Sequence, residues 1–266
     1  MNQSRDHQLT AAADILLAAR INAQVINSLP EALKPVGIDE SYQLQDHLNR
    51  RLSAAEPGKK TGYKIGCTTQ VMQKYLGIAH PCSGALFAAS TQQHNGEFSA
   101  ARLCRPGVEC EIAVQLDADM PAGQTYTAAD CDSFVRAAMC SIELVDDRWT
   151  DYRSVDPFSL IADNFFAAGC VLGEPVKLSS PTLAAVKGNL RINGSDIGSG
   201  SASDILGHPY EALAWLANHQ VQRGSPLQAG DYISLGSVVQ TYWLNPGDTV
   251  SIEFTELGSC TLQLTE

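Results

Sequence analysis

The sequence predicts an α+β fold in which a small helical region precedes a strand-rich core. Two observations favour this class. Residues 9–21 and 39–52 have apolar positions at helical spacing, and from Gly62 onward short β-branched runs alternate with turn signals. The chain has 266 residues, of which 44% are hydrophobic, so it can bury a substantial core. We therefore expect a helical region over 1–60 and a strand-rich core over 61–266, read as one structural domain with an N-terminal appendage.

The helical region contains two amphipathic segments. Within 39–52, three leucines recur at fourfold spacing, which places them on one helix face, and Asp39 is suited to cap the helix N-terminus. The stretch 57–60, with the sequence Pro-Gly-Lys-Lys, ends this region. The sequence therefore predicts two helices before the first strand of the core.

Strands and three further helices are mixed in the core. The helices are expected at 69–76, ended by Gly77, at 127–138, where Thr127 and Asp130 approximate a capping box, and at 209–222, ended by Gly224. Two turn signals separate strands near the C-terminus: Asn193-Gly194, which is typical of a β-hairpin, and the Asn-Pro-Gly-Asp stretch 245–248. No internal repeat interrupts this order.

Composition and charge exclude several classes of protein. The formal net charge of −11 argues against nucleic acid or an anionic membrane surface as a partner. No apolar stretch reaches the length of a transmembrane helix, and the polar first residues lack the apolar core of a signal peptide. The eight cysteines include no Cys-x-x-Cys pair and mostly lie among apolar residues, as reduced core cysteines do. We therefore expect a cytoplasmic protein.

Four charged residues lie in apolar runs, where an unpaired charge is costly. Glu109 and Glu111 share one face of a predicted strand because side chains alternate with period two, while Glu143 and Lys64 belong to two other apolar runs. Buried charges persist when they are paired or bind a metal. Three clustered carboxylates form an oxygen-only site that suits Mg²⁺ or Mn²⁺. The spacing therefore makes Glu109, Glu111 and Glu143 candidate metal ligands.

Spacing alone leaves two other interpretations open. Glu109 and Glu111 could belong to the solvated face of a half-buried sheet, since the alternate positions of 110–116 are apolar. Lys64 and Glu143 could pair only with each other as a structural ion pair. In either alternative these residues would bind no metal.

Motifs along nearly the whole chain carry a resemblance to one family. They are, in order, Gly62–Thr68, Leu76-Gly77, Gly84–Phe87, Pro106–Ala113, Ile142–Val145, Ala162–Asn164, Leu206–Pro209, Ala214–Ala217 and Gly230-Asp231. The set resembles the 2-hydroxypenta-2,4-dienoate (2-keto-4-pentenoate) hydratases and the related 4-oxalocrotonate decarboxylases of the fumarylacetoacetate hydrolase superfamily. Because the motifs occur together and in order, the resemblance is more specific than any one of them, and it favours the metal-site interpretation.

The resemblance implies a fold, an activity and partners. The fold would be the mixed β-sandwich roll of that superfamily with a small helical N-terminal region. The activity would be metal-dependent addition of water to 2-hydroxypenta-2,4-dienoate or a similar 2-oxo-enoic acid, giving a 4-hydroxy-2-oxo acid through a metal-stabilised enolate, with Lys64 as the catalytic residue that handles protons. The cofactor would be Mg²⁺ or Mn²⁺. The protein would be a homo-oligomer that can associate with other enzymes of the same pathway.

Two departures from the family pattern bear on the substrate pocket. Cys82 stands where the hydratases carry an aspartate, and the family's Asp-Asn-Ala-Ser becomes Asp-Asn-Phe-Phe at 163–166. A thiol is a poor substitute for a carboxylate, because it is mostly protonated near neutral pH and hydrogen-bonds weakly. The resemblance implies substrate-binding roles at these positions and at the histidine before the last helix, namely Cys82, Asp163, Asn164, Phe166 and His208.

Several of these side chains have structural alternatives. Asp163 and Asn164 could cap a turn, and His208 could bond backbone groups at the start of the helix that follows it. His80 could serve as an acid or base in place of the missing aspartate, or simply be exposed in its loop.

Other activities fit the same motifs. The decarboxylases tend to have an apolar residue where the hydratases have the aspartate, so Cys82 keeps 4-oxalocrotonate-type decarboxylation as the alternative. A third possibility is a carbon–carbon bond hydrolase of the same superfamily, although His47 in the N-terminal region has no convincing adjacent glutamate to form a general base. A non-catalytic partner subunit would keep the fold without binding a metal.

Overall fold

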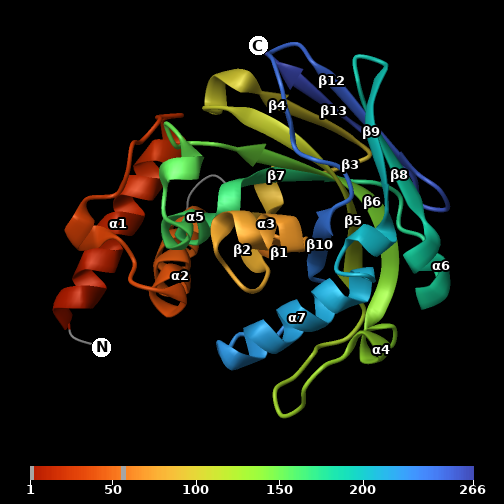
Figure 1. Cartoon of the computed structure of the whole chain (residues 1–266), viewed down its shortest axis with the longest axis horizontal. Coiled ribbons are helices and arrows are strands. Elements are labelled where there is room, and N and C mark those ends of the chain that lie inside the picture. Colours follow the sequence, from red (N-terminus) through yellow and green to blue (C-terminus); the bar gives the residue numbers. More distant parts are fainter. Residues whose placement is uncertain (1–2, 55–57) are drawn as a thin grey trace.

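The computed structural model of the chain describes residues 3–54 and 58–266, and it opens with two packed helices at one end of the molecule (Figure 1). These are α1 (Gln3–Ile21) and α2 (Ile38–Ala54). The prediction of two N-terminal helices is confirmed, and α1 begins earlier than expected. The N-cap prediction for Asp39 is wrong: the chain turns at Gly37, whose φ is 86°, so the helix already includes Ile38 and Asp39 lies in its first turn.

The larger of two sheets runs through the centre of the molecule. Its strands are, in spatial order, β2 (Cys82–Phe87), β1 (Lys60–Gly66), β10 (Tyr232–Ser237), β5 (Pro106–Leu116), β6 (Val135–Asp146), β7 (Ala167–Leu172) and β3 (Thr91–Gln93), with β11 (Tyr242–Trp243) paired to β5 beside this path. β5 and β6 form a long antiparallel pair, whereas β1 and β10 are parallel. The strand β10, which comes late in the sequence, therefore lies between two early strands.

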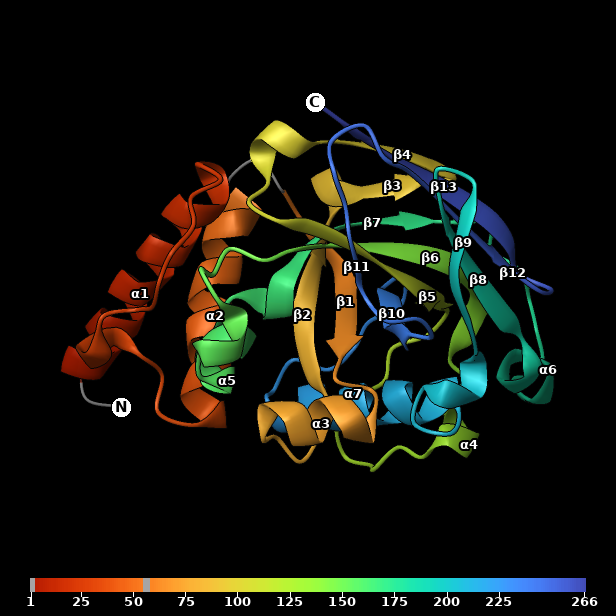
Figure 2. The ribbon, with the colours of Figure 1, turned by 45° about the horizontal axis from the view of Figure 1, so that its top comes forward.

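The smaller sheet covers one face of the larger one (Figure 2). Its strands are, in spatial order, β4 (Asn95–Ser99), β13 (Gly258–Thr265), β12 (Thr249–Phe254), β8 (Lys187–Ile192) and β9 (Ser195–Ser201). The predicted hairpin at Asn193-Gly194 is confirmed between β8 and β9, with φ angles of 52° and 79°. The predicted turn at 245–248 is confirmed by the hydrogen bond from the Asp248 N–H to the Asn245 carbonyl (3.1 Å).

The main core lies between the two sheets, and this decides which way the charged residues of β5 point. Val108, Cys110 and Ile112 are fully buried in that core together with residues of β12 and β13. Since side chains alternate along a strand, Glu109 and Glu111 point away from the smaller sheet. The face that carries the carboxylates is therefore the opposite face of the larger sheet.

Within the described residues, five α-helices follow β1 along the chain. They are α3 (Gln70–Leu76), α4 (Ala128–Cys131), α5 (Pro157–Ala162), α6 (Ser180–Ala185) and α7 (Pro209–Gln222). The predictions for α3 and α7 are confirmed, and Gly77 ends α3 in the left-handed conformation (φ 67°).

The predicted helix at 127–138 is wrong beyond its first turn. The capping box of Thr127 and Asp130 is present, but α4 has four residues and β6 begins at Val135. Pairing with β5 and burial against the rest of the sheet override the helix preference of the alanines at 137 and 138.

The N-terminal helices join the core through a second apolar cluster. Leu9, Leu16, Leu44 and Leu48 are buried there with residues of β2 and α5, among them Leu160. The α+β prediction is thus confirmed, while the division into a region 1–60 and a core 61–266 stays a prediction. Within the described residues, no helix is long and apolar enough to cross a membrane.

Candidate metal centre and substrate cavity

The β5–β6 register brings three carboxylates together. Glu109 pairs directly with Glu143 across the two strands, and Glu111 is two residues further along the same face of β5. One ligand oxygen from each of the three residues lies within 4.8 Å of the other two. Glu111 and Glu143 are fully buried and Glu109 is half-buried, so the alternative of a solvated carboxylate face is wrong for this part of β5.

Lys64 reaches the same cluster from β1. Its Nζ lies 2.9 Å from Glu143 Oε1, and both side chains are buried, with 2% and 0% exposed. Burial alone would lower the pKa of Lys64, but the charges of Glu143 and Glu109 outweigh it, and the pKa is raised. Lys64 is therefore protonated, and its pairing with Glu143 occurs inside the carboxylate cluster rather than apart from it.

Three donors orient the carboxylates. Ser234 Oγ and the Gly236 N–H (3.2 Å) donate to Glu111 Oε2, and Thr241 Oγ1 donates to Glu109 Oε1. The β10–β5 register shifts between Ser234 and Ser237, and this irregularity turns the Gly236 N–H toward Glu111. The sequence alone does not reveal these three donors, because their proximity to the carboxylates depends on the strand register and on the irregularity in β10.

The cluster carries more negative charge and more free acceptors than it can satisfy by itself. Glu111 Oε1 and Glu143 Oε2 are buried without a hydrogen-bond donor. Burial, with the charges of Glu143 and Glu109, raises the pKa of Glu111 well above its usual range. Burial also raises the pKa of Glu143 to about 7, against the opposing effect of Lys64. Converging, unsatisfied carboxylate oxygens of this kind fit a hard divalent cation.

A cavity of about 500 Å³ opens beside the cluster. Lys64 and Glu109 line it, together with Thr68, Thr69, Ser237 and Thr241. The remaining wall is mainly apolar and aromatic, formed by Ile65, Met72, Leu76, Val145, Tyr152, Phe165, Phe166, Val238, Val239 and Trp243. The site thus combines a charged end with an apolar body, as small-molecule sites commonly do.

Of the five positions expected to bind substrate, Phe166 lines this cavity. Cys82 is fully buried in β2 outside the lining, and burial raises the pKa of its thiol well above the usual value. His208 caps α7 by accepting a hydrogen bond from the Tyr210 N–H (2.9 Å), and its other ring nitrogen lies 3.1 Å from Ser180 Oγ. Neither Cys82 nor His208 faces the cavity.

Asp163 and Asn164 hold the segment that carries the phenylalanines. Asp163 binds Arg20 of α1 (2.7 Å) and Arg148 (3.0 Å), while Asn164 accepts from the Ala85 N–H (2.9 Å). The three residues 164–166 all have positive φ angles, between 46° and 67°, which non-glycine residues rarely adopt. These bonds offset that strain and place Phe165 and Phe166 in the cavity wall.

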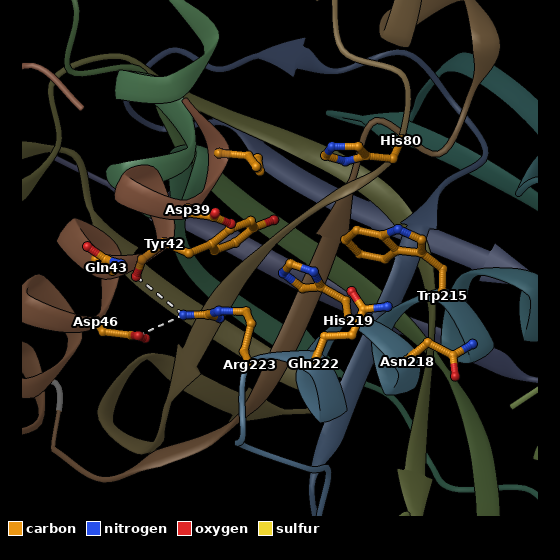
Figure 3. A pocket seen from close by; sticks show the side chains of 11 residues that line it. Asp39, Tyr42, Gln43, Asp46, His80, Trp215, Asn218, His219, Gln222 and Arg223 are labelled. Atoms are coloured by element: carbon orange, nitrogen blue, oxygen red, sulfur yellow. Dashed lines mark hydrogen bonds and ion pairs between the residues drawn. The ribbon is translucent and has the colours of Figure 1, made fainter. Parts of the chain in front are cut away.

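A second cavity, of about 540 Å³, lies between α2 and α7 (Figure 3). His80 lines it and stacks on Trp215, with ring centroids 6.3 Å apart, and Trp215 in turn stacks on His219 at 5.1 Å. Arg223 binds Asp46 across this cavity (2.8 Å). His80 is therefore in a different cavity from Lys64 and the three carboxylates.

Comparisons with known proteins find similarity to one family along nearly the whole chain. A family model described as fumarylacetoacetate (FAA) hydrolase C-terminal matches residues 75–265. The 2-keto-4-pentenoate hydratase of Paraburkholderia phymatum is 34% identical over 264 residues, 99% of this chain and 100% of that protein. The 2-hydroxyhexa-2,4-dienoate hydratase of Comamonas testosteroni is 31% identical over 95% of this chain and 94% of its own. The 4-oxalocrotonate decarboxylase of Pseudomonas putida G7, solved with magnesium and adipate, superposes with a TM-score of 0.91 at 25% identity, covering 97% of each chain.

Proposed function

The chain belongs to the fumarylacetoacetate hydrolase C-terminal family, and from this premise we propose that it is a divalent-metal-dependent hydratase of 2-hydroxypenta-2,4-dienoate or a similar 2-oxo-enoic acid. The observation that carries the proposal is the convergence of Glu109, Glu111, Glu143 and Lys64 at one end of a cavity. The full-length similarity to named hydratases supports it.

In this proposal Glu109, Glu111 and Glu143 hold the cation, which is Mg²⁺ or Mn²⁺. A cation bound there would supply Lewis-acid chemistry to the carboxylate and 2-oxo group of the substrate. Ser234 and Thr241 fix the orientation of two of the carboxylates, so that their free oxygens keep pointing into the cluster.

Lys64 is proposed as the catalytic residue. Its protonated ammonium lies on the cavity wall, held by Glu143 and positioned 5.0 Å from the centre of the Phe165 ring. From there it can stabilise negative charge that develops on the 2-oxo oxygen and pass a proton to the carbon skeleton. The apolar Phe165 ring beside Lys64 lowers the local dielectric constant, which strengthens these electrostatic interactions.

A proton NMR time course of 2-hydroxypenta-2,4-dienoate, with and without Mg²⁺, tests the proposal. We expect 4-hydroxy-2-oxopentanoate to form with the metal and not after its removal by a chelator. A Lys64→Met variant should bind the metal and form no product. A substrate that ketonises without gaining water in the presence of metal would contradict the hydratase.

Decarboxylation of a 4-oxalocrotonate-type acid is the second candidate. It is favoured by the similarity to a solved decarboxylase and by the thiol of Cys82 in the place of the hydratase aspartate. Release of carbon dioxide from 2-oxohex-3-enedioate, measured beside the hydration assay, separates the two activities. Homo-oligomer formation, association with other enzymes of the pathway and a cytoplasmic location stay predictions.

A further inference from the structure

Next to the carboxylate row, the same face of the larger sheet becomes apolar. Two residues before Glu109 on β5, Gly107 pairs with Val145 of β6. Gly107 lies on the same face as Glu109, about 6.7 Å along the strand from the Glu109–Glu143 pair. Trp243 of β11 pairs with Gly107, and a Cβ atom on that glycine would lie 2.8 Å from the indole ring. Glycine at this position therefore lets the indole lie directly over the strand beside the carboxylates.

Four aromatic rings continue this apolar surface from Lys64 to β11. Phe165 and Phe166 have ring centroids 5.3 Å apart, Phe166 and Tyr152 5.6 Å, and Tyr152 and Trp243 6.5 Å. Each distance is within the range of favourable aromatic pairs. Together with Val145 they form one continuous wall, which we call the ring wall (Val145, Tyr152, Phe165, Phe166 and Trp243).

The ring wall has no charge that would complement a second carboxylate. Among the described lining residues the charged ones are Lys64, Glu109 and Asp204, so the single cation lies at the carboxylate end. Arg105, outside the lining, stacks on Trp243 at 4.1 Å and pairs with Asp147 at 3.2 Å. A second carboxylate against the ring wall would lose water without gaining a free positive partner, which is unfavourable.

The cavity is also larger than a five-carbon acid requires. At about 30 Å³ for each water-sized group, the roughly eight non-hydrogen atoms of such an acid fill about 240 Å³. The cavity measures about 500 Å³. The cavity can therefore hold a substrate longer than five carbons.

We propose that the substrates are monocarboxylic 2-oxo acids whose far end carries an apolar group of several carbons, an alkyl chain or a phenyl ring, seated on the ring wall. The proposal rests on the proposed function, which places the carboxylate and 2-oxo group of the substrate at the three glutamates and Lys64. It sets the specificity: apolar tails are accepted and terminal carboxylates are rejected.

Binding of unreactive 2-oxo acids, measured by isothermal titration calorimetry in Mg²⁺, tests this specificity without turnover. The 2-oxo acids are pyruvate, 2-oxohexanoate, 4-phenyl-2-oxobutanoate and the dicarboxylate 2-oxoadipate, and oxalate, a tailless chelator, is the reference ligand for the metal end of the site. A fully buried methylene tightens binding about fourfold, the change that corresponds to about 0.8 kcal/mol. We expect 2-oxohexanoate and the phenyl acid to bind at least about tenfold more tightly than pyruvate, and 2-oxoadipate at least about tenfold more weakly than 2-oxohexanoate.

Two variants test whether the higher affinity for acids with apolar tails comes from contacts with the ring wall. Phe166→Ser and Trp243→Ala should each remove most of the advantage of the apolar tail while leaving the affinity for oxalate within about threefold. Phe134→Ser is the matched control, since Phe134 packs against the main core and does not line the cavity. Thermal unfolding of each variant confirms that it is folded.

The outcomes separate this inference from the proposed function. Absence of magnesium-dependent oxalate binding would overturn the metal site and the inference together. Normal oxalate binding with no gain from pyruvate to the apolar acids, or tighter binding of 2-oxoadipate than of 2-oxohexanoate, would overturn the inference alone. A tail advantage that Phe134→Ser removes as fully as Phe166→Ser would also contradict it.

Discussion

At the scale of single residues, spacing shows which charges are unusual, whereas the prediction that Glu109, Glu111 and Glu143 lie together rests on the family resemblance. The shared face of Glu109 and Glu111 follows from the period of a strand. Their proximity to Glu143 depends on the β5–β6 register, and residues 117–134, which separate the strands, do not specify it. The burial of Glu111 could not be predicted from β5 itself, because the alternation of its apolar neighbours indicates only one buried face, while the donors that bond Glu111, Ser234 and Gly236, come from β10, far along the chain.

Replacing Glu111 with Gln should separate metal binding from folding. The variant keeps its volume and its contact with Ser234 but loses a ligand charge, so Mg²⁺ should no longer raise its melting temperature, and activity should fall at least about a hundredfold. Without metal, it should be at least as stable as the natural protein, because a neutral amide avoids the cost of a buried carboxylate. Differential scanning calorimetry with and without Mg²⁺ measures both effects.

The matched control for that substitution is Glu174→Gln, on the exposed surface. It should retain the metal-dependent rise in melting temperature. If Glu111→Gln also retained it, Glu111 would not be a ligand.

His219 should make the protein less stable in acid. Burial, with the charges of Arg223 and His80, lowers the pKa of His219 to about 4 from its ordinary 6.5. Between these values the unfolded chain binds a proton that the folded protein does not, so the free energy of unfolding falls as pH decreases from 6.5 to 4. Urea unfolding across this range should show a flatter pH dependence for His219→Gln than for the natural protein, and His7→Gln, at an exposed position, is the matched control.

At the scale of elements, tertiary packing decides what local preference leaves open. Residues 135–138 have helix-forming alanines and still form the start of β6, because the strand pairs on both sides. The segment 163–166 is a similar case. Its sequence indicates a polar turn, but its backbone conformation is maintained by Arg20, Arg148 and Ala85, which are far from it in sequence or lie on other elements. Such long-range support could not be predicted from the segment itself.

Gly84→Ala should displace that segment. A Cβ atom at position 84 would lie 2.4 Å from the Asn164 carbonyl oxygen, so either β2 or the 164–166 turn must shift. We expect a loss of about 1–3 kcal/mol in stability and a higher KM, because Phe165 and Phe166 would move in the cavity wall. Chemical denaturation and steady-state kinetics measure the two effects.

Ser83→Ala, at the neighbouring position of β2, is the control. Its hydroxyl is buried without a hydrogen-bond partner, so its removal should cost little. If Ser83→Ala and Gly84→Ala lost equal stability, β2 would tolerate no change at either position. The close approach of Asn164 to Gly84 would then not be the cause of the loss.

At the scale of the whole molecule, one buried ion network ties the N-terminal helices to the catalytic core. Arg20 of α1 reaches Asp163 (2.7 Å) and the Ala167 carbonyl (2.9 Å), and Arg148 binds Asp163 and Asp146. Arg148 and both aspartates are almost completely buried. The network connects α1, the end of β6 and the start of β7, so the position of the N-terminal helices is coupled to the segment that lines the cavity.

Arg20→Met should therefore destabilise the molecule beyond the loss of one ion pair. It leaves the buried Asp163 with a single cationic partner, and breaking a buried pair typically costs about 3–5 kcal/mol. The surface pair of Arg51 and Asp14 also links α2 to α1, and Arg51→Met should cost less than about 1 kcal/mol. Hydrogen exchange should show faster opening of α1 in Arg20→Met; protection equal to that of Arg51→Met would refute the coupling.

The positions of the last strands have a consequence for how the protein is made. β10 lies between β1 and β5, and β13 lies between β4 and β12, so the larger sheet cannot be completed before residues 232–243 are made, nor the smaller sheet before residues 258–265. At about 5–20 residues per second, the nascent chain exposes unpaired strand edges for tens of seconds before they can be filled. Productive folding in the cell should thus depend on chaperones during synthesis, and deletion of β13 should yield aggregated rather than shortened protein.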